Sequence, residues 1–349
     1  MSEHNPLPRN VRHKPHHAES VWPILLILAL LAVVPVVATM LDDLFLLRFF
    51  TRAVIFSIAA VALNIALGYG AMVSLAHGAF MGLGGYTIGV LASADFFSEP
   101  LVSVPFAIGG TSDLLVSVPV AVAVSAGFAA IIGLICLRTT GMYFIMITLA
   151  FNQMLYFLFV AWERFGGEDG LQILSELRVS DMDPTGRIPF FYICVATLGL
   201  VLLFTNRLAR SPFGLVLRGI SQNETRMTAV GIPVFVYRWV AFTISGALTG
   251  LAGAYLAISQ MFVSPVDLYW IRSADLVVMA VLGGISVAWG PVVGAFFFLA
   301  AELLLSSWSI YWNMLLGSFI ILVAIFLPSG LALFSPLRLL RTFRRSSDG

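Results

Sequence analysis

Charged residues are scarce in this sequence. Only 11% of its 349 residues are Asp, Glu, Lys or Arg, whereas 60% are hydrophobic. Soluble domains normally carry about 25% charged residues. The deficit excludes a large water-exposed domain and indicates an integral membrane protein, and the mean hydropathy of +0.98 favours the same class.

Cysteine is nearly absent as well. Cys136 and Cys194 each lie within an apolar run. Two such residues provide neither a disulfide framework nor the ligand spacing of a zinc site, so we interpret them as small buried residues. Four of the five histidines lie in the N-terminal tail, which we interpret as solvated rather than metal-binding: His4, His13, His16 and His17.

Catalytic motifs are also missing. The sequence contains no GxxxxGK[ST] phosphate-binding loop, no HExxH and no GxSxG. An intramembrane enzyme is disfavoured because no paired acid and base or metal-ligand spacing is present. We expect no cofactor in this chain. If it takes part in ATP-driven transport, ATP and Mg²⁺ must be bound by separate subunits.

Apolar stretches long enough to form membrane helices recur along the chain. A helix needs about 20 apolar residues to cross the hydrocarbon core. The third and eighth stretches are glycine-rich, and broken or re-entrant helices, buried in protein or lining a cavity, are the alternative there. We predict an all-α polytopic membrane protein with about ten (8–10) transmembrane helices, over residues 21–40, 52–69, 73–93, 114–137, 142–162, 188–205, 234–259, 274–288, 292–307 and 310–327.

The first stretch follows a basic tail, as the apolar core of a signal peptide would. It is long for such a core and contains two prolines. We therefore predict that residues 21–40 are retained as the first span.

Basic residues are unevenly distributed about these spans. With the N-terminus in the cytoplasm and ten alternating spans, the outer loops hold only Arg48, Arg52, Arg164, Arg178, Arg187 and Arg272. The other 13 of the 19 basic residues fall on the cytoplasmic side: Arg9, Arg12, Lys14, Arg138, Arg207, Arg210, Arg218, Arg226, Arg238, Arg338, Arg341, Arg344 and Arg345. This bias predicts an N-in, C-in orientation, with cytoplasmic tails at 1–20 and 329–349 around a transmembrane domain at 21–328.

Two polar loops stand out. Residues 206–233 carry four arginines against one acid, Glu224, and we predict a cytoplasmic loop containing a short amphipathic helix over 213–232. We expect this helix to be broken at Gly219. The outer loop at 163–187 begins with the turn-rich RFGGEDG and is either a docking surface for an external partner or an ordinary solvated loop.

Some polar residues interrupt the apolar stretches. Polar groups within the hydrocarbon region are costly and often functional. For His77, Asn152 and Gln153, the alternative is a hydrogen bond to a neighbouring helix. Glu302 is the only acid deep in a strong span, unless it reaches the outer surface, and Asp275 lies near the start of a weak one. The candidates for a substrate pathway are Asn64, Ser74, His77, Asn152, Gln153 and Glu302.

A short internal similarity links two glycine-rich segments. GAFMGLGG at 78–85 and GALTGLAG at 246–253 share five of eight residues. Duplication is common in transporters, but small residues every four positions are also what close helix packing requires. We favour packing.

Several longer segments together resemble the permease subunits of bacterial branched-chain amino acid ABC importers, the LivH/LivM family, and are most like the LivM type. The similarity covers roughly residues 55–328. Its marks are ALNIALGYGAMVSLAHGAFMGLGGY, RTTGMYFIMITLAFNQ, GGEDGL, RSPFGLVLRGISQNETRMTAVGI, FTISGALTGLAGA and MAVLGGISVAWGPVVGA.

The resemblance implies a multi-pass protein of the bacterial inner membrane that moves Leu, Ile or Val by alternating access. It implies four kinds of partner besides the lipid bilayer: two cytoplasmic ABC ATPases, a second, LivH-like permease and a periplasmic amino-acid-binding protein. No nucleic acid is implied. Residues 218–231 resemble the helix that couples such permeases to the ATPase, with coupling residues Arg218, Asn223, Glu224, Thr225, Arg226 and Gly231.

Two features leave alternatives open. The family often has small residues at the positions of Thr225, Arg226 and Met227, so the contacts of these three residues with an ATPase are open. Permeases of the same family carry urea, amides or aromatic acids, so the cargo is open as well. A stand-alone secondary transporter is the more distant alternative. It would need buried ionisable groups, for which Glu302 is the main candidate and Asp275 and His77 are lesser ones.

Overall fold

The structure is a computed structural model that describes residues 22–40, 42, 44–97, 110–174, 186–285, 287–308 and 310–326. The two predicted tails and residues 175–185 of the predicted outer loop lie outside the described residues.

Helices form nearly all of the described part, so the all-α prediction is confirmed. The one strand pairing joins β1 (Leu171–Gln172) antiparallel to β2 (Phe262–Val263). Short η helices occupy Ile65–Tyr69, Glu163–Phe165, Gly167–Asp169 and Pro265–Leu268. The α helices are α1 (Trp22–Met40), α2 (Leu44–Asn64), α3 (His77–Phe97), α4 (Leu114–Cys136), α5 (Met142–Ala161), α6 (Arg187–Arg210), α7 (Pro212–Gln222), α8 (Glu224–Ala229), α9 (Val234–Gln260), α10 (Trp270–Gly283), α11 (Gly290–Trp308) and α12 (Trp312–Phe326).

Each of the ten predicted apolar stretches overlaps one of these helices. Within the described residues, seven helices are long and apolar enough to cross a bilayer: α1, Leu44–Tyr69, α4, α5, α6, α9 and α11. Large apolar side chains cover the outside of the bundle, as on α1, where Leu26 and Leu30 are 68% and 69% exposed. Such a surface is stable in lipid and not in water, so the chain is a multi-pass membrane protein.

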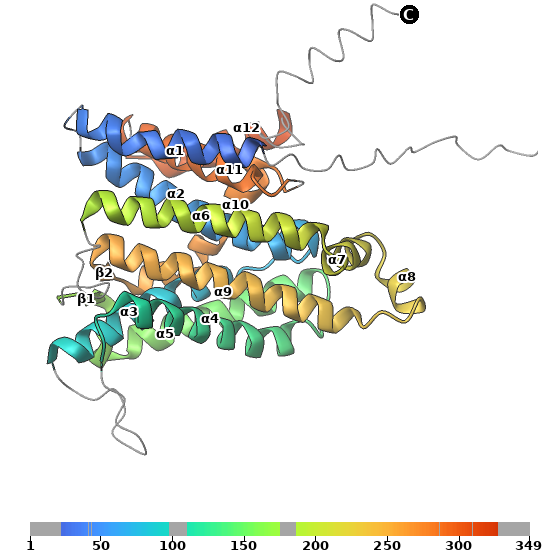
Figure 1. Ribbon diagram of the computed structural model, residues 1–349. Coiled ribbons are helices and arrows are strands. Elements are labelled where there is room, and N and C mark those ends of the chain that lie inside the picture. Colours follow the sequence, from blue (N-terminus) through green and yellow to red (C-terminus); the bar gives the residue numbers. More distant parts are fainter. Residues whose placement is uncertain are drawn as a thin grey trace, which may run out of the picture.

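The long helices run roughly side by side, and the two ends of the bundle differ (Figure 1). β1 and β2 lie at one end, which we call the strand end. α7 and α8 project at the other, which we call the α7–α8 end. α9 packs against α2, α3 and α4 and forms the centre of the bundle.

The two similar glycine motifs face each other in the contact between α3 and α9. A Cβ atom at Gly84 would overlap the carbonyl oxygen of Gly250, and one at Gly253 would overlap that of Met81. The packing interpretation of the internal similarity is therefore confirmed, because only residues without a side chain let these two backbones approach so closely.

The third and eighth predicted stretches are both broken, as the sequence indicated. α3 begins only at His77, and residues 71–76 before it are not helical. α10 has 14 residues, too few to cross a bilayer alone, and follows a non-helical turn at Tyr269. Both helix starts lie in the interior, because Ser273 of α10 is fully buried.

Three arginines are not where the sequence placed them. Arg48 was expected in an outer loop and Arg52 at the outer edge of the second span, but that helix begins at Leu44 and contains both. Arg272 was expected in a loop and lies in the first turn of α10. The error arose because the span boundaries were drawn at the edge of the apolar run. A helix can continue past that edge, because an arginine side chain can lay its apolar stem along apolar surface while its charged end reaches a polar environment.

Candidate functional site

The interrupted start of α3 is held by side chains from two other helices. The first N–H groups of a helix have no partner within the helix. The N–H of Gly78 donates to Oγ of Ser273 at 2.7 Å, and that of Ala79 donates to Oδ1 of Asn152 at 2.8 Å. Ser273 Oγ in turn donates to the carbonyl of Leu75 at 2.7 Å. The breaks before α3 and α10 are thus joined to each other.

Asn152 of α5 completes this junction. Its Nδ2 donates to the carbonyl oxygen of Leu268 at 2.8 Å, so one side chain bonds the first turn of α3 and the short η helix that precedes α10. Nearby, Thr148 accepts from the N–H of Leu75 at 3.2 Å. We call Thr148, Asn152 and Ser273, with the backbone that they bond, the central crossing. Broken helices at such a depth form substrate sites in many transporters, because their free backbone groups can bind polar ligands.

His77, at the start of α3, is fully buried beside the crossing. Its Nε2 lies 2.8 Å from Oγ of Ser245, whose hydroxyl donates to the carbonyl of Ala62 at 2.6 Å. Since that donation uses the single hydroxyl proton, Nε2–H is the donor to Ser245. The rings of Phe80 and Phe242 pack around it at 5.6 and 5.8 Å. In this conformation His77 has the buried, hydrogen-bonded form, and contact with substrate stays a prediction.

The other predicted pathway residues are spread more widely. Ser74 is buried next to the crossing and accepts from the N–H of Ala76 at 3.2 Å. Asn64 reaches the α10–α11 connection, where it donates to the carbonyl of Val287 at 3.4 Å. Oε1 of Gln153 is buried with no hydrogen-bond partner among the described residues. Ser74, His77 and Asn152 are therefore the candidates that the fold brings together.

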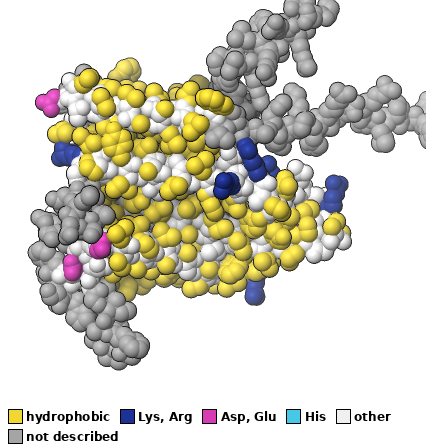
Figure 2. Space-filling view, viewed as in Figure 1, with side chains coloured by type: hydrophobic (Ala, Val, Ile, Leu, Met, Phe, Trp, Pro, Cys, Tyr) yellow, Lys and Arg dark blue, Asp and Glu magenta, His cyan; other side chains and the backbone are white. Residues whose placement is uncertain are grey.

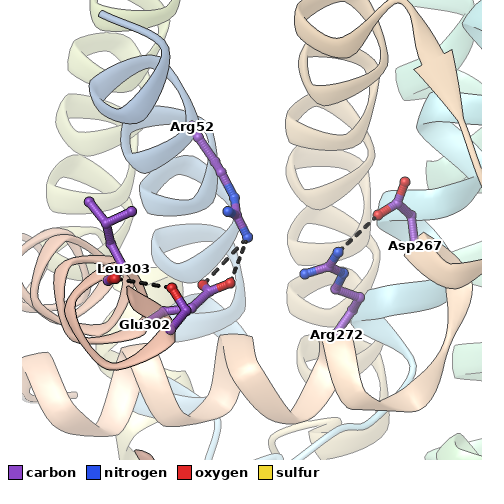
Figure 3. A network of polar contacts seen from close by, with 6 residues as sticks. Arg52, Asp267, Arg272, Glu302 and Leu303 are labelled. Carbon is purple, nitrogen blue, oxygen red and sulfur yellow. Dashed lines mark hydrogen bonds and ion pairs between the residues drawn. The ribbon is translucent and has the colours of Figure 1, made fainter. Parts of the chain in front are cut away.

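Glu302 lies apart from the crossing and is ion-paired. Its Oε1 is 3.2 Å from Nη2 of Arg52, which joins α11 to α2 (Figure 3). A second pair, Arg272 with Asp267 at 3.5 Å, lies close by. Both guanidinium groups approach the ring of buried Phe56, at 5.6 and 5.9 Å. Sequence reasoning missed these partners because it placed both arginines in loops.

Cavities open at both ends of the bundle. One of about 630 Å³ lies between the strand-end portions of α2, α6 and α9 and is lined by Arg48, Arg52 and Arg187, among others. Another of about 280 Å³ lies beside residues 71–73 and the α4–α5 turn, and includes Arg238 of α9. Within the described residues, no cluster of His, Cys, Asp and Glu suits a metal ion.

The predicted amphipathic helix over 213–232 is two helices, and the predicted break at Gly219 is wrong. The chain breaks at Asn223, whose Oδ1 caps α8 by accepting from the N–H of Arg226 at 2.9 Å. Gly219 stays helical and packs against Met227. Asn is a preferred N-cap residue because its side chain replaces a missing backbone acceptor. The predicted end at Gly231 is confirmed, with φ at +89°.

Two contacts connect α7 and α8 to the bundle. Glu224 of α8 pairs with Arg238 of α9 at 2.9 Å, and Arg238 is only 16% exposed. The guanidinium of Arg218 lies 4.9 Å from the ring centre of Tyr69, the last residue of the η helix that precedes the break at 70–76. The sequence analysis predicted that Glu224 contacts an ATPase subunit. In the structure its carboxylate forms an ion pair with Arg238 of the same chain.

The opposite surface of α7 and α8 faces outward. Leu215 and Val230 are 61% and 73% exposed, and Thr225 and Arg226 are exposed beside them. Sequence alone did not single out the two apolar residues. Solvent-exposed apolar side chains on a short helical projection suit a groove on another protein.

Comparisons with known proteins identify the family. The family model for the branched-chain amino acid transport system / permease component matches residues 45–325. The LivM permease proteins of Salmonella typhimurium and Escherichia coli are 26% and 25% identical over 305 residues, covering 80% of this chain and 68% of theirs. A nucleoside ABC transporter permease, NupC of Lactococcus lactis, is 40% identical over 68 residues, 20% of each chain. No solved structure matches the chain. Because the family model spans most of the chain, the protein belongs to the branched-chain amino acid transport permease family.

Proposed function

We propose that this chain is a permease subunit of an ATP-driven ABC importer that moves Leu, Ile or Val across the bacterial inner membrane. The observation that carries the proposal is the exposed α7–α8 projection on a membrane bundle of this family. ATP and Mg²⁺ would bind to two separate ATPase subunits. The remaining partners are a second, LivH-like permease and a periplasmic binding protein that selects the ligand.

The proposed orientation places the α7–α8 end in the cytoplasm. Dark blue basic side chains gather mainly around that end, while the acidic side chains seen on this face lie at the strand end (Figure 2). Excess Lys and Arg on one side is the usual signature of the cytoplasmic side. The strand end would then face the periplasm and receive the binding protein.

The two contacts behind α7 and α8 suggest how ATPase movement reaches the bundle. An ATPase that grips Leu215, Arg226 and Val230 would shift α8 together with its ion pair to Arg238. It would also shift Arg218 against Tyr69, directly before the non-helical residues 70–76. Arg238 and residues 71–73 both border the smaller cavity. Movement of the coupling helices would therefore reshape the cytoplasmic mouth next to the break.

Alternating access would then open the central crossing. The buried groups of His77 and Asn152 would become available to a substrate, because their partners belong to other helices, and Ser74 lies in the non-helical segment between them and would be exposed by the same movement. Asn64, Gln153 and Glu302 remain secondary pathway candidates.

Two alternative functions remain, and the transport assay described next distinguishes both from the proposal. Permeases of this family for urea, amides or aromatic acids would differ only in cargo. A stand-alone secondary transporter is disfavoured by the pairing of Glu302 with Arg52, since an ion- or proton-coupled carrier needs that carboxylate to be available.

The test is transport by the reconstituted system. The chain, its partner permease and the ATPases would be assembled in proteoliposomes, with the binding protein and radiolabelled L-leucine outside. We expect uptake only with ATP on the ATPase side. Uptake driven by an ion gradient without ATP would refute the importer, and ATP-driven uptake of urea or an amide in place of leucine would refute the cargo.

A further inference from the structure

The larger cavity, at the strand end, has an unusual distribution of charge. Three arginines line it, Arg48, Arg52 and Arg187, and none of the described residues that line it is Asp or Glu. Arg52 is shared with Glu302 at 3.2 Å. Within the described part of the chain, neither Arg48 nor Arg187 forms an ion pair. The α2 and α6 side of the cavity is therefore strongly positive.

The facing wall has the opposite polarity. The C-terminal end of α9 lines this side through Leu256, Ile258, Ser259, Gln260 and Met261. The last carbonyl groups of a helix lack intrahelical partners and carry its negative dipole end. A positive wall thus faces the carboxyl end of a helix across one cavity. A ligand that carries both charges fits better than a simple anion.

Apolar side chains complete the lining. Leu47 and Phe190 are buried and lie on the α2 and α6 side, and Leu256 lies on the α9 side. The volume, about 630 Å³, is in the range of small-molecule sites. A hydrophobic side chain of modest size can be covered there while the charged ends of the molecule meet the two polar walls.

We propose that this cavity is an entry site for a zwitterionic α-amino acid with an aliphatic side chain. The carboxylate is held by Arg52 with Arg48 or Arg187, as guanidinium groups bind carboxylates in paired hydrogen bonds. The ammonium group donates to the terminal carbonyls of α9. This assignment rests on the proposed function and adds to it a location and the residues that would hold each charged group of the ligand.

The ion pair gives the site a possible consequence for transport. A substrate carboxylate that engages Arg52 competes with Glu302 for the same guanidinium group. Binding would loosen the link between α2 and α11. Arg52 and Arg272 both contact Phe56, so the change is carried to the start of α10 at the central crossing.

The test measures protection of an engineered thiol in the reconstituted transporter, without the binding protein. Cys136 and Cys194 are buried, so background labelling of this chain is low. Ser259→Cys places an accessible thiol in the cavity wall, and Glu163→Cys is the matched control on an exposed residue elsewhere. The labelling rate with a charged methanethiosulfonate is followed against L-leucine, 4-methylpentanoate and 3-methylbutylamine.

We expect saturating L-leucine to slow labelling of Ser259→Cys severalfold and to leave Glu163→Cys unchanged. Each analogue lacks one charge and should need a higher concentration for half-protection, by about tenfold, the usual effect of losing one charged hydrogen bond. Arg48→Ala combined with Arg187→Ala should weaken protection by L-leucine by a similar factor. Arg164→Ala, outside the cavity, should not.

Four results would overturn the site, the third of them from a parallel experiment in which the binding protein is added. Leucine that fails to protect, in a transporter with normal ATP-driven leucine uptake, refutes the entry site and leaves the importer intact. Labelling that responds to anionic lipid content and not to leucine assigns the cavity to a lipid headgroup. Protection by the binding protein alone, with or without amino acid, assigns it to protein docking. Absence of any amino acid uptake refutes the importer and this site together.

Discussion

Replacing Asn152 by leucine should destabilise the bundle strongly, because one side chain satisfies two buried backbone groups. Asn152 is fully buried, accepts from the N–H of Ala79 at 2.8 Å and donates to the carbonyl of Leu268 at 2.8 Å. Leucine has the same branched arrangement of side-chain heavy atoms as asparagine and is not smaller, so no cavity is created. The substitution leaves one donor and one acceptor without partners in the interior.

The expected cost follows from these two groups. A buried polar group that loses its partner costs about 1–3 kcal/mol, so two together cost roughly 2–6 kcal/mol. Hydrogen bonds between membrane helices average nearer 0.6 kcal/mol, which sets a lower figure of about 1 kcal/mol for the pair. Even the lower figure exceeds the effect expected at the neighbouring Gln153. There Oε1 already lacks a partner among the described residues, so Gln153→Leu should be neutral or stabilising.

The assay is thermal unfolding of the assembled transporter, followed with a dye that fluoresces on reaction with thiols. Cys136 and Cys194 are buried and become reactive only when this chain opens, provided that the partner subunits carry no cysteine. We expect a clearly lower midpoint for Asn152→Leu than for Gln153→Leu. Equal midpoints would show that the hydrogen bonds of the central crossing contribute little, and the reasoning would fail.

Three further substitutions test other parts of the structure. Gly253→Val should abolish recovery of folded protein from detergent, because its Cβ would overlap the carbonyl of Met81, whereas Gly127→Val, with no atom nearby, should be tolerated; equal yields would contradict the α3–α9 packing. Gly231→Pro should stop uptake while membrane insertion persists, because proline cannot adopt φ of +89°, and normal uptake would contradict the importance of this turn. Glu224→Arg should impair uptake severalfold by placing two cations together, and adding Arg238→Glu should restore most of it; absence of rescue would show that the ion pair does not transmit movement.

The local pattern of the sequence was sufficient for the helices and their weak points. Apolar length located a helix in each of ten stretches, and glycine content identified the two broken ones. The motifs around Gly84 and Gly250 were correctly predicted to be packing surfaces, because small residues at every fourth position are typical of closely packed membrane helices. These features depend on neighbours within one or two turns, so a single segment reveals them.

Boundaries and partners were predicted less well. The break at Asn223 was missed because a glycine was taken as the stronger signal, although the asparagine cap decided the outcome. Arg52 was assigned to a loop, and Glu302 therefore appeared as an unpaired acid within a span. The two residues are 250 positions apart, and a local sequence pattern cannot predict a contact over that separation.

By itself, the sequence determined that the chain lies in a membrane as helices and that a basic loop stands between spans, and it marked two glycine-rich spans as candidates for interruption. Composition and short-range spacing are enough for these conclusions, because in lipid the backbone N–H and C=O groups of each segment must form hydrogen bonds within that segment. Only the tertiary structure decided which polar groups meet. Asn152 and Ser273 close the crossing, Arg52 holds Glu302, and Arg238 holds Glu224. Those pairings follow from how distant helices pack, and packing is a property of the whole bundle.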